Sequence, residues 1–134
     1  MAKVYLSVPI VANRDTRTAR EIAGTIKSAG HELISPWVIS EDPNDGLNEV
    51  SVFERDAGGV RGCDMIIAEV STPSHGVGME IMLAHTLGKK VICVYRQGVR
   101  LSWMVKGLPG AVLIEFKDEG DLRKKLSMKL SGKK

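Results

Sequence analysis

Five apolar runs rich in β-branched residues recur along the 134-residue chain, with a helical pattern after each of them. The runs lie at residues 3–10, 31–38, 64–71, 90–96 and 111–117. Strands that are apolar on both faces are typical of parallel sheets, because helices cover such sheets on both sides. We therefore expect an α/β fold, a three-layer sandwich around a mostly parallel five-stranded sheet.

The helical patterns between the runs support this architecture. After the first run, one helix face is formed by Ala19, Ile22, Ala23 and Ile26, and Gly30 ends that helix. Further helices are expected over residues 48–62, 76–88, 101–108 and 119–130. Strand and helix thus alternate five times along the chain.

The helix expected over residues 48–62 follows a segment with turn signals, residues 40–49, which we expect to be a surface loop. Gly58 and Gly59 weaken the helical pattern near its end. One apolar stripe nevertheless runs along this helix, formed by Val50, Phe53, Ala57 and Val60.

The distribution of charge argues against nucleic-acid binding. The chain has 19 basic and 16 acidic residues, which gives a formal net charge of +3, but six of the basic residues stand in the segment 122–134. The rest of the chain is slightly acidic, so the basic pI does not indicate a surface for nucleic acid. We expect one domain over residues 1–134 and interpret residues 122–134 as a solvated basic helix or tail.

Neither the cysteines nor the apolar stretches indicate a metal, a cofactor or a membrane. Cys63 and Cys93 stand far apart, with no CxxC motif and no nearby histidine pair, so we expect buried, reduced thiols in a cytoplasmic protein. The N-terminal run passes into ANRD rather than a small-residue cleavage site, which argues against a signal peptide. No apolar stretch approaches the ~20 residues needed to cross a bilayer.

A ligand site is expected where parallel strands end. In open α/β sheets ligands bind beyond the carboxyl ends of the strands, and here the loop TPSHGVG leads from the third strand into a helix. Free N–H groups and the positive end of the helix dipole favour an anion there. Ser74 adds a hydroxyl, and Gly76 and Gly78 allow close approach to the backbone. No GxGxxG motif follows the first strand, so this is not a dinucleotide fingerprint.

Glu80 lies one turn into that helix. At ~100° per residue its neighbours on the helix surface are Val77, Leu83, Ala84 and Leu87, which places its carboxylate in the centre of an apolar stripe. A buried carboxylate is unfavourable without a partner, and its pKa tends to rise. Two interpretations remain open at this point: a buried salt bridge or cap, and a reactive carboxylate beneath a ligand.

A second carboxylate favours the reactive interpretation. Asp56 lies at the edge of the apolar stripe on the preceding helix, where it is either a solvated aspartate or a partner of Glu80. Two carboxylates at one pocket are what cleavage of a glycosidic bond requires, one at the anomeric carbon and one for the proton of the leaving group. Tyr5 in the first strand either packs in the core or adds a phenolic hydrogen bond.

Four segments together resemble the nucleoside 2-deoxyribosyltransferase superfamily: VYLSVPI, the aspartate of FERDAGGVRGCDMIIAEV, the run PSHGVGMEI and the serine of RLSWM. Within it the chain is most similar to the 2'-deoxynucleoside 5'-phosphate N-hydrolases. The resemblance covers nearly the whole chain and implies a flavodoxin-like fold, a homodimer and hydrolysis of deoxynucleoside monophosphates to a free base and 2-deoxyribose 5-phosphate.

By position, the resemblance implies roles for single residues. Glu80 matches the nucleophile, Asp56 the acid that serves the departing base, and Tyr5 the tyrosine that orients the glutamate. Ser74 and Gly76 match phosphate-binding positions. Ser102 matches a serine that completes the partner subunit's phosphate site.

The chain departs from the hydrolases at two places. Where they carry a Gly-Ser-Ile-Arg type run after the first strand, this chain has Val8, Pro9, Ile10 and Val11, so the backbone N–H of the serine and the positive charge of the arginine are missing. Ile10 is still expected at the substrate. Trp37 stands where the hydrolases tend to have a histidine, near the base pocket, and Arg14 is a candidate to replace the missing cation.

Three functions follow from the sequence. The first is hydrolysis of a small deoxynucleotide through a covalent intermediate on Glu80, with no metal or cofactor. The second is transfer of the deoxyribosyl group to another base. The third is a non-catalytic nucleotide-binding module; a phosphoacceptor receiver is disfavoured because the first strand is followed by PIVAN rather than an acidic pair.

Overall fold

A computed structural model describes residues 1–11 and 14–132 of the chain. Five strands form one parallel sheet in the order β2-β1-β3-β4-β5. They are β1 (Lys3–Ser7), β2 (Glu32–Leu33), β3 (Met65–Glu69), β4 (Lys90–Arg96) and β5 (Val112–Phe116). This order is that of the flavodoxin-like folds, so the predicted fold class is confirmed.

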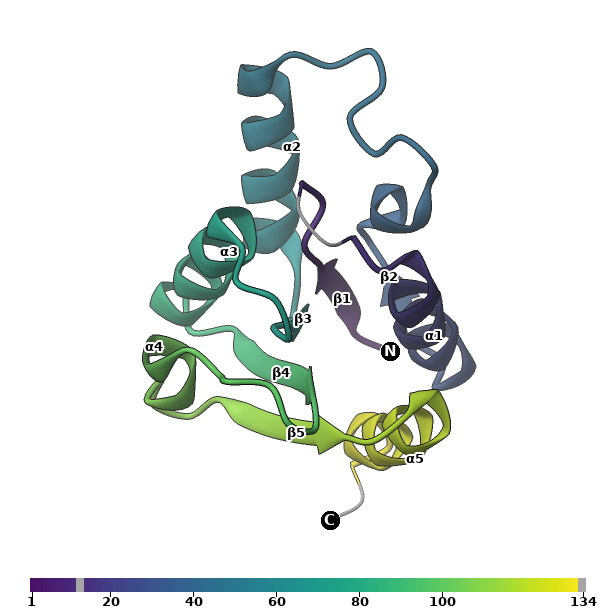
Figure 1. Ribbon diagram of the computed structural model, residues 1–134. Helices are drawn as coiled ribbons and strands as arrows, with labels where there is room; N and C mark the ends of the chain where they lie inside the picture. The colour runs from purple at the N-terminus through teal and green to yellow at the C-terminus, as the bar shows by residue number, and fades with distance from the viewer. Residues whose placement is uncertain (12–13, 133–134) are drawn as a thin grey trace.

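Helices cover both faces of the sheet (Figure 1). On one face lie α1 (Thr16–Ser28) and α5 (Glu119–Leu130), and on the other α2 (Glu49–Gly62), α3 (His75–Thr86) and the short α4 (Trp103–Lys106). Alternate strand residues enter two separate cores: Val4 and Leu6 of β1 pack on the α1 side, whereas Tyr5 packs on the α2 side. The sandwich therefore has the three layers that the sequence predicts.

The second strand is much shorter than the predicted run of residues 31–38. β2 ends at Leu33, and the chain turns into a short 3₁₀ helix, η1 (Pro36–Ile39). Pro36 has no N–H for the ladder and disfavours continuation of it. The buried hydroxyl of Ser35 takes over the pairing, because it accepts from the N–H of Leu6 at 2.8 Å and donates to its carbonyl oxygen at 3.0 Å.

Helix α2 buries only part of its predicted stripe. Ala57 and Val60 lie in the core, but Val50 and Phe53 are 66% and 55% exposed. Figure 1 explains the difference, since the first turns of α2 extend beyond the sheet, where no other element of the described chain covers them. Gly59 in the later turns lies so close to the ring of Tyr5 that a Cβ there would be 2.7 Å from a ring carbon.

The C-terminal segment forms the expected helix, but one face of this helix is buried rather than solvated. Helix α5 packs on α1 and the sheet through Leu122, Leu126 and Leu130, all of which are buried, while its basic side chains face outward. Lys133 and Lys134 of the predicted tail lie outside the described residues. Within residues 1–11 and 14–132, no helix is both long and apolar enough to cross a membrane.

Candidate active site

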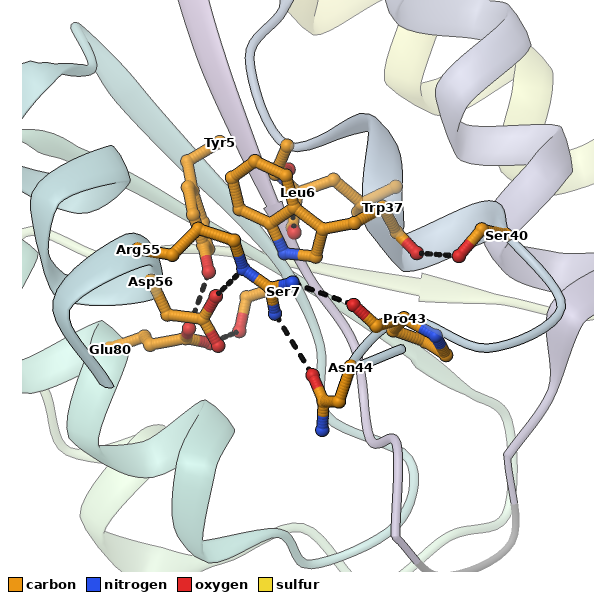
Figure 2. A network of polar contacts seen from close by, with 11 residues as sticks. Tyr5, Leu6, Ser7, Trp37, Ser40, Pro43, Asn44, Arg55, Asp56 and Glu80 are labelled. Atoms are coloured by element: carbon orange, nitrogen blue, oxygen red, sulfur yellow. Dashed lines mark hydrogen bonds and ion pairs between the residues drawn. The ribbon is translucent and has the colours of Figure 1, made fainter. Parts of the chain in front are cut away.

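Glu80 lies at the border of the buried face of α3, not at its centre as predicted. The buried residues of this helix are Val77, Ile81 and Ala84, and Leu87 is exposed. The buried stripe is thus rotated slightly from the predicted one, and Leu87 is the C-cap residue that follows the last turn of the helix. Glu80 is therefore half-buried and points along the sheet toward β1 (Figure 2).

Two hydroxyl groups of β1 hold the Glu80 carboxylate, one on each oxygen (Figure 2). The phenol of Tyr5 donates to Oε2 at 2.5 Å, and the hydroxyl of Ser7 donates to Oε1 at 2.6 Å. Residues two apart on a strand point to the same side, so one strand supplies both donors. Ser7 was not predicted from the sequence, although its spacing from Tyr5 could have revealed it.

The surroundings of Glu80 act on its charge in opposite directions. Burial raises the pKa of Glu80 above its ordinary value, and the hydrogen bonds from Ser7 and Tyr5 offset part of this rise. Burial and the nearby Glu80 charge raise the pKa of Tyr5 strongly, so the phenol keeps its proton and stays a donor. The arrangement holds a carboxylate that is poorly solvated yet fixed in position.

Asp56 of α2 shares a cavity with Glu80. The cavity has a volume of about 610 Å³ and lies between α2, α3 and the loop that precedes α2; Gly76, Asn44 and Leu83 also line it. The Asp56 side chain is only 20% exposed, and its Oδ1 accepts a hydrogen bond from Nε of Arg55 at 2.8 Å. The alternative of a freely solvated aspartate is therefore wrong.

Arg55 is a second residue of the site that was not predicted from the sequence. Besides Asp56, its guanidinium donates to the carbonyl oxygen of Pro43 at 2.6 Å and to Oδ1 of Asn44 at 3.0 Å. It also lies over the ring of Trp37, 4.4 Å from the centroid. The sequence pattern indicates only an ordinary surface charge at Arg55, because Asn44 and Pro43 stand eleven and twelve residues away in an irregular loop.

Trp37, a residue of η1, lies beside Tyr5 and Arg55 in Figure 2. Its ring contacts the Tyr5 ring edge to face, with centroids 6.1 Å apart. It does not line the cavity that contains Glu80 and Asp56. Trp37 thus contacts Arg55 and Tyr5 and does not line the cavity itself.

Arg14 does not replace the missing cation near β1. Its guanidinium donates to the carbonyl oxygens of Glu41 at 3.1 Å and Val38 at 3.2 Å, and to that of Ser40. Arg14 therefore ties the start of the 40–48 loop to the body of the protein. Ile10 is half-buried and packs against the core on the α1 side.

The remaining predicted residues lie around the N-terminus of α3. Ser74 is its N-cap and accepts a hydrogen bond from the N–H of Val77 at 3.3 Å. A separate cavity of about 470 Å³ between α3 and α4 is lined by Ser74, Ser102, His75 and Arg100. Gly76 lines the Glu80 cavity, whereas Ser102 does not. Tyr5, Asp56, Gly76 and Glu80 are thus brought together within one chain, and Ser102 is kept apart from them.

The described part of the chain contains no group of three or more His, Cys, Asp or Glu side chains placed to hold a metal ion. Both thiols are buried and free, and burial raises the pKa of Cys93 to about 11. At the Glu80 cavity, the groups that can act on a substrate include Glu80 with its two hydroxyl donors and the Asp56–Arg55 pair.

The amino-acid sequence is similar to those of known proteins. Residues 4–119 match the family profile described as nucleoside 2-deoxyribosyltransferase. A protein of Methanococcoides burtonii, named as a candidate 2'-deoxynucleoside 5'-phosphate N-hydrolase, is 34% identical over 78% of this chain and 89% of its own length. The 5-hydroxymethyl-dUMP N-hydrolase of Esox lucius is 33% identical over 78% of this chain and 77% of its own.

Solved structures share the fold. A CMP N-glycosidase of Clostridium botulinum is similar with a TM-score of 0.76 over 95% of this chain and 98% of its own, at 19% identity. The protein BlsM gives a TM-score of 0.78 over 97% and 90% of the two chains, at 14% identity. From the profile match and the sequence relatives together, the chain belongs to the nucleoside 2-deoxyribosyltransferase family and is an enzyme of the N-glycosidase and deoxyribosyltransferase type.

Proposed function

We propose that the protein hydrolyses the N-glycosidic bond of 2'-deoxynucleoside 5'-monophosphates. The observation that carries this proposal is the Glu80 carboxylate, which is poorly solvated, held on both oxygens by Tyr5 and Ser7, and shares a cavity with Asp56. A carboxylate fixed in this way is suited to attack an anomeric carbon, because its orientation is set before the substrate arrives. The names of the Methanococcoides burtonii and Esox lucius relatives support the same substrate class.

The reaction has two steps in this proposal. An oxygen of Glu80 forms a bond to C1' while the bond from C1' to the base nitrogen breaks, and the base leaves with the electron pair. Asp56 supplies the base with a proton, directly or through a water molecule. Water then attacks C1', releases 2-deoxyribose 5-phosphate from Glu80, and gives its proton to Asp56. The missing 2'-hydroxyl leaves the oxocarbenium-like transition state less destabilised.

The 5'-phosphate is proposed to bind at the N-terminus of α3. Free backbone N–H groups and the helix dipole favour an anion at this end, where Ser74 and Gly76 stand. The segment after β1 contributes little, because Pro9 has no N–H and Val11 has no charge, and Arg14 is engaged by loop carbonyls.

We propose a homodimer that completes this phosphate site. Ser74 and Ser102 line the same cavity on the far side of α3 from Glu80, where the hydroxyl of Ser102 makes no capping hydrogen bond to α4 in the described structure. In the dimer it would reach the phosphate held by the partner. Trp103 and Met104 beside it are 85% and 74% exposed, and they are residue types enriched in interface cores.

One assay tests the proposed reaction and its alternative. The protein is incubated with a panel of deoxynucleosides and their 5'-monophosphates, with and without an added acceptor base, and free base and new nucleosides are quantified. Base release from monophosphates without an acceptor supports hydrolysis. Base release that requires the acceptor would identify a deoxyribosyltransferase, and binding without cleavage of any substrate would contradict the proposal in favour of a binding module.

A further inference from the structure

The Arg55 guanidinium joins two parts of the molecule that are separate in the sequence. Through Nε it holds Asp56 on its own helix, and through its two terminal nitrogens it holds Pro43 and Asn44 in the loop before α2 (Figure 2). Its planar fork serves three acceptors in different directions, which a lysine ammonium on a flexible stem cannot reproduce. The Arg55 side chain is 19% exposed, so these contacts are made largely away from water.

The loop over residues 40–48 is held at its start and in its middle by two arginines from different parts of the chain. Arg14 holds its start through backbone carbonyls, and Arg55 holds its middle. Within the loop, the N–H of Asp45 donates to Asp42 at 3.3 Å and the N–H of Leu47 donates to Asn44 at 3.0 Å. Because Asn44 and Leu47 also line the Glu80 cavity, the position of this loop sets the shape of the cavity.

We propose that Arg55, supported by the ring of Trp37, is a positioning residue that latches residues 43–44 over the Glu80 cavity and fixes the orientation of Asp56. The ring of Trp37 lies against one face of the guanidinium and restricts its rotation. The latch itself does not depend on the proposed function. Its role in substrate binding rests on that function.

Arg55 also brings a positive charge to a pair of carboxylates. The charged or titratable groups that face Glu80 are Tyr5 from β1 and Asp56 and Arg55 from α2, and Arg61 and Glu49 line the same cavity. The Asp56 charge raises the pKa of Glu80 and the Arg55 charge lowers it, although burial is the larger cause of its rise. Loss of the Arg55 charge is therefore expected to raise the pKa of Glu80 further.

Four variants separate the latch from the charge. Arg55→Lys keeps the charge and removes the fork, Arg55→Gln removes both, and Arg14→Ala frees only the start of the loop. Arg20→Lys on the exposed face of α1 is the matched control. Thermal unfolding first establishes that each variant is folded. Amide exchange at Asp45 and Leu47 then measures how firmly Arg55 holds the loop. NMR titration of the Glu80 carboxyl carbon measures the effect of the Arg55 charge on the pKa of Glu80. Neither measurement depends on turnover.

In Arg55→Lys we expect exchange at Asp45 and Leu47 to rise about tenfold, the effect of losing about one charged hydrogen bond, with the titration of Glu80 near that of the wild type. In Arg55→Gln exchange rises equally and the Glu80 titration moves to higher pH. Arg14→Ala raises exchange without moving the titration, and Arg20→Lys changes neither. With an active substrate, both Arg55 variants raise KM more than they lower kcat.

Unchanged exchange in Arg55→Lys and Arg55→Gln would overturn the latch, and an unmoved Glu80 titration in Arg55→Gln would overturn the charge effect. A wild-type protein that cleaves no nucleotide would refute the proposed function, while the exchange and titration results would still decide the role of Arg55. Lower kcat with unchanged KM would overturn the role of the latch in substrate binding and leave only the effect of Arg55 on Asp56.

Discussion

Glu80 keeps its carboxylate in surroundings that disfavour its negative charge. Burial raises its folded-state pKa above the ordinary value of 4.5. Between these two values the folded protein holds a proton that the unfolded chain has released, so the free energy of unfolding falls as the pH rises through this window. The charge of Glu80 is therefore retained at a cost in stability, as is common for reactive groups.

The substitution Glu80→Gln tests both the proposed role of Glu80 in catalysis and its cost in stability. It removes the nucleophile, and we expect turnover to fall by about a thousandfold or more. The amide can still hydrogen-bond with Tyr5 and Ser7, so the protein should stay folded. Its stability relative to the wild type should grow as the pH rises from 4.5, which urea unfolding at several pH values measures. Normal turnover together with a lower unfolding midpoint would mean that Glu80 is structural.

Asp56→Asn tests the proton that the departing base requires. Asparagine has nearly the same shape but supplies no proton, and it weakens the ion pair with Arg55. We expect natural bases to be released about 10²- to 10⁴-fold more slowly, with a much smaller effect on a substrate that has an activated leaving group. Equal slowing of both substrates in steady-state assays would argue against an acid role for Asp56.

At the scale of elements, the approach of α2 to the sheet depends on one glycine. A Cβ at Gly59 would lie 2.7 and 2.9 Å from two ring carbons of Tyr5, and that ring is buried and tied to Glu80. By contrast, a Cβ at Gly58 meets no described atom within 4 Å. The two glycines that weaken the helical pattern in the sequence therefore differ in function: one is required for packing and the other is not.

Substitution of Gly58 and Gly59 by alanine, one at a time, gives a matched pair of variants. Gly59→Ala should lower the free energy of unfolding by about 1–3 kcal/mol through overpacking, and should reduce turnover because Tyr5 is displaced. Gly58→Ala should raise stability by up to about 1 kcal/mol, because alanine favours the helix. Urea unfolding midpoints with unchanged m-values distinguish these results. Similar stabilisation by both alanines would contradict the tight contact with Tyr5.

The helices and strands could be predicted from the sequence because the spacing of apolar residues within each segment indicates its secondary structure. The exceptions have physical causes. The second strand was overestimated because its apolar pattern continues past the point where Ser35 and Pro36 end the ladder. The site was predicted only in part. Ser7 was overlooked although it stands two residues from Tyr5 on the same strand, and Arg55 was overlooked because its partners Pro43 and Asn44 lie in an irregular loop. Periodicity also cannot tell which apolar residues another surface covers, as Phe53 illustrates.

At the scale of the whole molecule, large apolar side chains remain exposed on the side of the sheet that carries the proposed site. They are Val50, Phe53, Met79, Met82, Trp103 and Met104, on α2, α3 and α4. Exposed groups of this kind mark interaction surfaces. They support the proposed homodimer, in which Ser102 of each chain would serve the site of the other.

Mixing two inactive or weakened chains tests this assembly. Ser102→Ala should weaken monophosphate binding without loosening the dimer, and Glu80→Ala should abolish turnover. In a mixed dimer one site collects both defects while the other regains both residues, so about a quarter of all sites should be intact after equal random exchange. Activity should then exceed that of either parent. No gain after chain exchange has been verified by mass spectrometry would show that Ser102 does not act across the interface.

The hydroxyl of Ser35 has a consequence for behaviour at high concentration. Beyond the short β2, β1 forms the rim of the sheet, and Ser35 occupies both backbone groups of Leu6 that an incoming strand would need. At the opposite rim, the ammonium of Lys125 lies 2.7 Å from the carbonyl oxygen of Glu115 in β5. Unpaired strand edges are the usual starting points of aggregation, and charged or occupied edges resist it. Both edges of this sheet are thus protected against pairing with strands of other molecules. The exposed apolar side chains on the helices remain available for association.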